Sequence, residues 1–183
     1  MQQNLEIEFK MLVSRDQFET LKQRCQPLQL TVQTNVYYDC TPSAARRRIA
    51  MRIRDVEGRH WFTCKVPSDN GVMEYELPLQ ENSAQALRIP PVQSLFDQLG
   101  LTLPVHETGR MTTWRYHRRY PLGELCLDYS LINGHDDYEI EFEVSGDPQQ
   151  GKAFFMALLR QAGIFYQENR RSKYARCVLE RTE

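Results

Sequence analysis

The sequence of 183 residues lacks several features that define whole classes of protein. It has no uninterrupted apolar stretch of about 18 residues, the length that a membrane-spanning helix needs. Lys and Arg number 23 and Asp and Glu number 24, so no excess charge attracts nucleic acid or an anionic membrane nonspecifically. The acidic N-terminus lacks the basic and apolar regions of a signal peptide. We therefore expect no nucleic-acid partner and no membrane.

Common metal and nucleotide motifs are missing as well. The cysteines are Cys25, Cys40, Cys64, Cys126 and Cys177. They form no C-x-x-C pair and their number is odd, so we expect reduced thiols and a cytoplasmic location. The histidines have no H-E-x-x-H spacing, and no P-loop is present. A zinc site and a Walker-type nucleotide site are therefore not expected.

Period-two alternation of apolar and polar residues, the pattern of β-strands, dominates the chain. It predicts about eight strands, over residues 5–11, 35–39, 50–55, 61–66, 72–79, 112–119, 124–131 and 138–144. Hairpin turns are predicted at Glu57-Gly58, Asn70-Gly71 and Asn133-Gly134. The length and the even composition favour a single domain over residues 1–183, of the α+β class and mainly antiparallel β.

Helices are predicted between these strands. Ser14-x-x-Gln17 has the form of a capping box, and apolar residues follow at helical spacing. A second helix is predicted over residues 91–100, between a proline and a glycine, and a third from Asp147 or Pro148 to Gly163. Residues 172–180 fit either a short helix or a last strand.

The polar faces of the predicted strands consist of charged residues. These residues are Glu6, Glu8 and Lys10, then Arg52 and Arg54, then Lys65, then Glu74 and Glu76, and finally Glu139, Glu141 and Glu143. For one strand this is an ordinary solvated face. Over the whole set it is unusual, because Thr has a higher strand propensity than Glu or Lys. Glutamates at alternate positions also lie about 7 Å apart, which costs energy unless cations lie among them.

This mixture of charges favours a particular ligand. Arg and Lys bind phosphate oxygens, and carboxylates bind hard cations such as Mg²⁺ or Mn²⁺. If the charged faces turn toward one another, they form a polar cavity for a polyanion that carries divalent cations.

The order of these motifs resembles that of the CYTH superfamily, the triphosphate tunnel metalloenzymes. The matching segments are Glu6-Ile7-Glu8-Phe9-Lys10, Tyr37-Tyr38-Asp39, Met51-Arg52-Ile53-Arg54, Thr63-Cys64-Lys65, Glu74-Tyr75-Glu76, Thr113-Trp114-Arg115, Leu125-Cys126-Leu127-Asp128, Glu139-Ile140-Glu141-Phe142-Glu143 and Ser172-Lys173-Tyr174. The chain is most similar to the small single-domain bacterial branch that is often labelled adenylate cyclase. The resemblance implies an eight-stranded, closed or nearly closed barrel, with helices packed outside and a triphosphate in its tunnel.

The resemblance also implies roles for individual positions. Triphosphate oxygens would be bound by Lys10, Arg52, Arg54, Lys65, Arg115 and Lys173. One or two Mg²⁺ or Mn²⁺ ions would be held by Glu6, Glu8, Asp128, Glu139 and Glu141. Within these sets the catalytic residues would be Glu6, Glu8, Asp128 and Lys65. Less definite positions are Glu74, Glu76, Glu143 and Arg119.

The function that the resemblance implies is metal-dependent hydrolysis of inorganic triphosphate or a related organic triphosphate. The alternatives are a class IV adenylate cyclase, a thiamine triphosphatase and a non-catalytic module that binds polyphosphate or nucleotide. A cyclase must hold adenine, and only Trp61 and Trp114 offer a stacking surface, although packing is the usual role of a strand Trp. The expected partner is a small triphosphate, and both a monomer and a homodimer fit.

Overall fold

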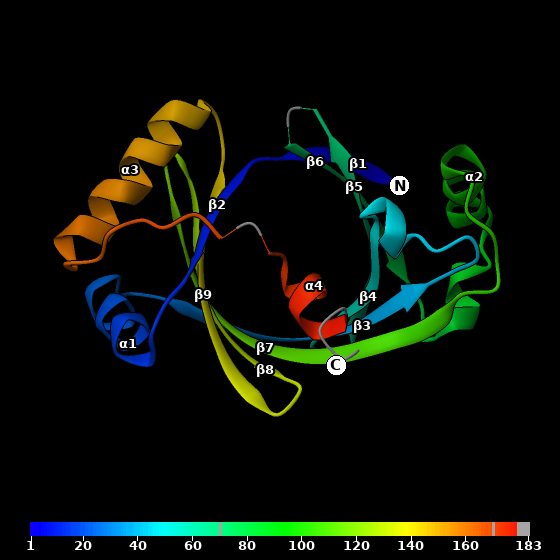
Figure 1. The fold of residues 1–183 in the computed structure, drawn as a ribbon, viewed down its shortest axis with the longest axis horizontal. Helices are drawn as coiled ribbons and strands as arrows, with labels where there is room; N and C mark the ends of the chain where they lie inside the picture. Colours follow the sequence, from blue (N-terminus) through cyan, green and yellow to red (C-terminus); the bar gives the residue numbers. More distant parts are fainter. Residues whose placement is uncertain (70, 170, 179–183) are drawn as a thin grey trace. The chain divides into compact units, whose positions relative to one another are not determined.

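The computed structural model describes residues 1–69, 71–169 and 171–178 (Figure 1). These residues form two compact units, each of which is described here by itself. The first unit comprises Met1–Leu5, Gln33–Met111 and the chain from Tyr174, and the second comprises Glu6–Val32 and Thr112–Lys173. The assignment of one domain to residues 1–183 stays a prediction.

Antiparallel strands make up most of both units, as predicted. The described residues form β1 (Gln2–Glu6), β2 (Glu8–Leu12), β3 (Gln29–Asp39), β4 (Ala50–Val56), β5 (Arg59–Ser68), β6 (Gly71–Leu79), β7 (His106–Tyr120), β8 (Gly123–Ile132) and β9 (His135–Val144). The strand order is β1-β6-β5-β4-β3 in the first unit and β7-β8-β9-β2 in the second. Strands β3 and β7 each run from one unit into the other. The mainly antiparallel class is confirmed.

The structure has nine strands in its described part where the sequence predicts about eight. The difference lies at the N-terminus, where the strand predicted over residues 5–11 is divided at Ile7. β1 is the neighbour of β6, whereas β2 pairs with β9. The two halves therefore have different partner strands, although apolar and charged residues alternate in the sequence across Ile7.

The helices begin and end close to the predicted residues. They are α1 (Arg15–Arg24), α2 (Pro90–Leu99), α3 (Pro148–Gln161) and α4 (Lys173–Val178). Ser14 and Gln17 form the predicted capping box at the start of α1. Gly100 ends α2 with a φ of 60°, a left-handed conformation that glycine adopts readily. Within the segment 172–180, which fitted either a helix or a strand, the described residues Lys173–Val178 form a helix, α4. No helix of the described residues is long and apolar enough to cross a membrane.

Two of the predicted hairpin turns are present. Glu57 and Gly58 connect β4 to β5, and Asn133 and Gly134 connect β8 to β9; all four have positive φ. Positive φ at both central residues matches the twist of the flanking strands. The third predicted turn, Asn70-Gly71, includes a residue outside the described ones.

Each unit has its own hydrophobic core. In the first unit Phe62 of β5 packs against Phe96 of α2. In the second, α1 and α3 lie against β9 (Figure 1), and Phe142 of that strand stacks on Phe155 of α3. Because side chains alternate along a strand, the glutamates of β9 lie on its other face.

Candidate functional site

Charged residues of the second unit form what we call the carboxylate cluster. Its members are Arg115 of β7, Asp128 of β8, Glu139, Glu141 and Glu143 of β9, and Lys173 of α4. Strand register brings them together, because Arg115 lies opposite Asp128, which in turn lies opposite Glu139. Asp128 and Glu139 are fully buried, and Glu141 is 6% exposed.

Arg115 connects three of these carboxylates. Its Nε and Nη2 donate to the two oxygens of Asp128, each at 2.8 Å. Nη2 also donates to Glu141 at 2.5 Å, and Nη1 donates to Glu143 at 3.0 Å. The Glu143 side chain is 35% exposed, so it lies at the edge of the cluster. A guanidinium is well suited to bind several carboxylates at once, because its N–H donors lie in one plane and have fixed directions.

The ammonium of Lys173 lies among the same carboxylates. Its Nζ is 2.9 Å from Asp128 Oδ2 and 2.5 Å from Glu141 Oε1, and it also pairs with Glu139. The other oxygen of Glu139 accepts a hydrogen bond from Asn169 Nδ2 at 2.7 Å. Asn169 also binds β2, since its backbone N–H donates to the Lys10 carbonyl at 2.9 Å. Asn169 was not predicted, and a single amide in a loop gives no sequence pattern that identifies it.

The pKa values in the cluster follow from this pairing. Burial raises the pKa of Asp128, but the charges of Arg115 and Lys173 outweigh it, and the net pKa lies below its ordinary value. Burial likewise raises the pKa of Glu141, yet Lys173 and Arg115 hold it well below its usual range. Burial lowers the pKa of Lys173, but the surrounding carboxylates raise it well above the ordinary value. These groups are therefore all ionised at neutral pH.

The N-terminal motif contributes a neighbouring ion pair. Glu8 and Lys10 of β2 bind each other through their side chains. Lys10 lies opposite Glu141 on β9, and Glu8 lies opposite Glu143. Glu6 is the last residue of β1 and is partly buried. Its role as a metal ligand stays a prediction.

The first unit contains a second group of charged residues, which we call the basic cluster. Its members are Arg52 and Arg54 of β4, Lys65 of β5, and Glu74 and Glu76 of β6. Glu74 Oε1 lies 3.9 Å from Arg52 Nη2 and 3.5 Å from Lys65 Nζ. Arg54 Nε donates to Asn35 at 3.0 Å, and Glu76 accepts from Thr63 at 3.4 Å.

Arg52 is the residue of the basic cluster best placed to accept an anion. Its side chain is only 14% exposed, and its nearest described ion pair, with Glu74, is long at 3.9 Å. Its Nε is buried and has no hydrogen-bond partner among the described residues. A buried donor without an acceptor costs free energy, and a phosphate oxygen is an acceptor that a guanidinium binds strongly.

A divalent cation needs several carboxylate oxygens around it. In the described part of the chain, no three His, Cys, Asp or Glu side chains are arranged to hold a metal ion. The Lys173 ammonium lies among three of the five carboxylates that the resemblance assigns to metal. The donor chemistry nevertheless fits, because carboxylate oxygens are the ligands of Mg²⁺ and Mn²⁺. With the Glu8–Lys10 pair included, the carboxylate cluster has five carboxylates and three cations. Its net charge is therefore −2.

Arg119, one of the less definite predictions, lies outside both clusters. Its side chain is 87% exposed, and its Nε is 3.9 Å from Glu124. Trp114 stacks on Tyr129 with ring centroids 5.3 Å apart, as part of an aromatic row that continues to Tyr138. This packing is the usual role of a tryptophan in a strand.

Comparison with known proteins identifies the family. The model of the CYTH domain matches residues 4–177, so the chain belongs to the CYTH family. A Bacillus subtilis protein named "Putative triphosphatase YjbK" is 32% identical to it, over 94% of this chain and the whole of that protein. The predicted family is confirmed.

Solved structures show the same fold. A Bacillus halodurans protein described as a "putative adenylate cyclase" is 28% identical, with a TM-score of 0.84 over 96% of this chain and 98% of that one. A Hippeastrum protein, HpAC1, whose description states a dominant triphosphatase activity, is 22% identical, with a TM-score of 0.76 over 93% and 94% of the two chains. At that identity the Hippeastrum likeness supports the fold alone.

Proposed function

We propose that this CYTH protein hydrolyses a triphosphate, inorganic or organic, with the help of Mg²⁺ or Mn²⁺. The observation that carries the proposal is the division of charge between its two clusters. In the basic cluster three cations outnumber two carboxylates, and Arg52 has a buried donor without a described partner. In the carboxylate cluster negative charge is in excess. The charge of the basic cluster therefore suits phosphate groups, and the charge of the carboxylate cluster suits a metal ion.

The name of the Bacillus subtilis relative supports the reaction type. That relative matches along its whole length at 32% identity, and its name is "Putative triphosphatase YjbK". The cyclase label of the Bacillus halodurans structure, which is 28% identical, makes adenylate cyclase the second candidate. The two reactions differ in which phosphorus is attacked, and so in their products.

The residues of the chain have separate tasks in this proposal. Arg52, Arg54 and Lys65 donate to phosphate oxygens and stabilise charge that spreads over them in the transition state. The carboxylates Asp128, Glu139 and Glu141 would hold the metal ion. When bound, such an ion offsets phosphate charge and lowers the pKa of a coordinated water.

Arg115 acts on the reaction by positioning the carboxylates. It fixes Asp128 through both oxygens and holds Glu141 beside it. Because the pKa of Asp128 is lowered, this carboxylate is a weak base at neutral pH, and its contribution is its charge rather than proton transfer. Lys173 is a counter-charge among the carboxylates and, with Lys10, a further candidate for contact with phosphate.

Phosphate release from inorganic triphosphate, thiamine triphosphate and ATP tests this function. Each substrate is supplied with Mg²⁺, with Mn²⁺ and with a chelator. We expect phosphate release from at least one substrate with metal and none with chelator. Absence of phosphate release from all three, with both metals, would contradict the proposal.

One variant, with a control outside both clusters, tests the task of the carboxylate cluster. Glu141→Gln removes a buried carboxylate and is expected to lower kcat by two orders of magnitude or more, because a metal ligand is lost. Glu19→Gln, on the exposed side of α1, is the matched control and is expected to retain the wild-type rate. Location in the cytoplasm and the choice between a monomer and a homodimer stay predictions.

A further inference from the structure

Strand β3 contributes buried polar side chains to the first unit. Gln33 is 3% exposed and Asn35 is 2% exposed, although side-chain amides usually lie in solvent. Burial of an amide costs free energy unless the amide is hydrogen-bonded. For Asn35 a partner is Arg54 of the basic cluster, whose Nε donates to Asn35 Oδ1 at 3.0 Å.

The register of the sheet creates this contact. Asn35 of β3 lies directly opposite Arg54 of β4, so the two side chains leave the sheet on the same face. Arg52 shares that face, because it lies two residues before Arg54 on the same strand. Asn35 therefore reaches the basic cluster from a strand that contributes none of its charged members.

The contact fixes the direction of the Arg54 guanidinium. The three nitrogens of a guanidinium lie in one plane, and Nε is the nitrogen closest to the backbone. An acceptor held at Nε therefore sets the plane of the whole group, including its outer nitrogens Nη1 and Nη2. Asn35 is itself well placed to hold Nε, because it is buried and belongs to a strand that pairs with β4. A strand holds a side chain more exactly than a loop does.

An amide suits this task because it has no charge. The basic cluster has three cations and two carboxylates, so its net charge is +1. A carboxylate at position 35 would also accept from Nε, and more strongly, but it would reduce this net charge to zero. The amide oxygen of Asn35 orients Arg54 and leaves the positive charge of the cluster unchanged.

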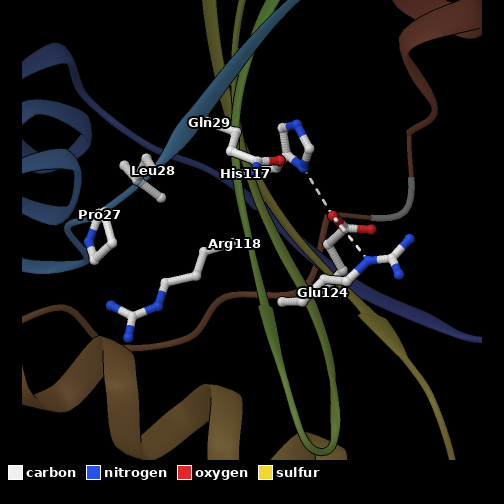
Figure 2. Close-up of a pocket in the computed structure, with 7 residues that line it drawn as sticks. Pro27, Leu28, Gln29, His117, Arg118 and Glu124 are labelled. Atoms are coloured by element: carbon white, nitrogen blue, oxygen red, sulfur yellow. Dashed lines mark hydrogen bonds and ion pairs between the residues drawn. The ribbon is translucent and has the colours of Figure 1, made fainter.

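The second unit shows the opposite arrangement. There the carboxylate of Glu124 lies 2.8 Å from His117 Nδ1 (Figure 2) and 3.9 Å from Arg119 Nε. A carboxylate beside an arginine offsets the charge that would attract an anion. The choice of an amide beside Arg54 therefore favours anion binding at the basic cluster.

We propose that Asn35 is a positioning residue for triphosphate binding. It holds Arg54 at Nε in the orientation in which the guanidinium meets phosphate oxygens, and it acts through Arg54 rather than by touching the ligand. The inference rests on the proposed function, in which Arg54 donates to phosphate. Orientation of a long side chain before binding raises affinity, because less rotamer freedom is lost when the ligand binds.

A double-variant cycle tests this role through binding alone. Isothermal titration calorimetry gives the Kd for inorganic triphosphate, with chelator so that no metal-dependent hydrolysis takes place. The variants are Asn35→Leu, Arg54→Met and the protein that carries both changes. Leu has the branched shape of Asn but no acceptor, and urea denaturation shows that each variant is folded. Gln93→Leu is the matched control, because Gln93 is an exposed residue of α2 whose amide donates to the Arg88 carbonyl at 3.2 Å.

We expect Asn35→Leu to raise the Kd about tenfold when Arg54 is present, because the guanidinium loses the acceptor that orients it. In the Arg54→Met background the same change is expected to alter the Kd by less than about twofold, because the group that Asn35 orients is absent. Asn35→Asp keeps the acceptor but adds a negative charge, so it is expected to raise the Kd in both backgrounds. Gln93→Leu is expected to keep the wild-type Kd.

Equal effects of Asn35→Leu in the two backgrounds would overturn the inference, and so would a wild-type Kd in Asn35→Leu. If Asn35→Leu does not fold, Asn35→Ser replaces it with the same two expectations, since its smaller side chain leaves space for a water. Failure of the proposed function is recognised separately, as a wild type that hydrolyses no triphosphate; the cycle still decides the role of Asn35, because it measures binding. A wild type that binds no triphosphate, with or without Mg²⁺, would overturn both.

Discussion

Arg115 binds both carboxylate oxygens of Asp128, at 2.8 Å each, and Asp128 is completely buried. This pair lies at the centre of the carboxylate cluster, because Arg115 also contacts Glu141 and Glu143. Placing charges away from water costs free energy, which is recovered only when each charge has well-oriented partners. The pairs of the cluster are therefore expected to depend on one another.

Breaking this pair is expected to destabilise the fold. Asp128→Asn removes one of the buried negative charges that pair with Arg115. We expect the free energy of unfolding to fall by about 3 kcal/mol. Urea denaturation measures it. The control is the exposed pair of Glu107 and Arg110, which has the same two-bond geometry at 3.1 and 3.0 Å. Glu107→Gln is expected to cost less than about 1 kcal/mol. Equal losses in the two variants would contradict the account.

Removal of Lys173 is expected to make the protein respond more strongly to metal. In Lys173→Met the carboxylates lose the ammonium that lies among them, so the melting temperature with chelator should fall, by roughly 5–10 °C. Mn²⁺ should then raise the melting temperature more in this variant than in the wild type, because binding to the folded state stabilises it by mass action. Lys22→Met, in the weaker pair of α1, is the control. An identical Mn²⁺ response in variant and wild type would show that these carboxylates do not hold metal.

The stability of the first unit is expected to depend on pH through Asp39. Asp39 Oδ1 accepts the backbone N–H groups of Cys40, at 2.8 Å, and Ala44, at 2.7 Å, and Oδ2 accepts the Ser43 hydroxyl at 2.7 Å. Burial raises the pKa of Asp39, but these hydrogen bonds outweigh it and the net pKa is lowered. The stabilisation is therefore present above the unfolded pKa, about 3.9, and is lost as the pH falls through the lower folded pKa.

Asp39→Asn tests this dependence. The free energy of unfolding, measured in urea from pH 6 to pH 2, should decrease less steeply below pH 4 in the variant than in the wild type. At neutral pH the variant should be less stable, by about 1–3 kcal/mol, because the amide group replaces one acceptor oxygen by a donor. Parallel curves for the two proteins would refute a role for Asp39 in acid unfolding.

Arg52 is expected to bind the triphosphate directly. Arg52→Met removes the guanidinium while keeping much of the side-chain volume, and we expect the Kd for inorganic triphosphate to rise roughly ten- to a hundredfold, since bonds to charged groups are the stronger kind. Isothermal titration calorimetry gives the Kd. Arg59→Met is the matched control, because Arg59 lies on the neighbouring strand with a side chain that is 70% exposed. A wild-type Kd in Arg52→Met would place phosphate binding elsewhere.

Much of the fold was predictable because side chains alternate along strands. The alternating charges of β9 indicated that its glutamates share a face, and the register with β8 agrees with that. The division of the N-terminal strand at Ile7 could not be predicted. It depends on which strands accept its hydrogen bonds, and the alternation of side chains continues across it.

The candidate site was predictable in its residue types but not in its pairing. The resemblance to the CYTH family implied that Arg115, Asp128 and Glu141 share a site, but not that one guanidinium bridges the two acids. Asn169 was not predicted, because its position depends on a loop whose backbone is hydrogen-bonded to β2. Such contacts leave no periodic pattern.

The most direct test of the central claim is the identity of the products formed from ATP with Mn²⁺, followed by ³¹P NMR. Hydrolysis of the terminal phosphate predicts ADP and inorganic phosphate in equal amounts, and from inorganic triphosphate it predicts pyrophosphate and phosphate. Cyclic AMP and pyrophosphate from ATP, with inorganic triphosphate left intact, would contradict the account and identify the protein as an adenylate cyclase.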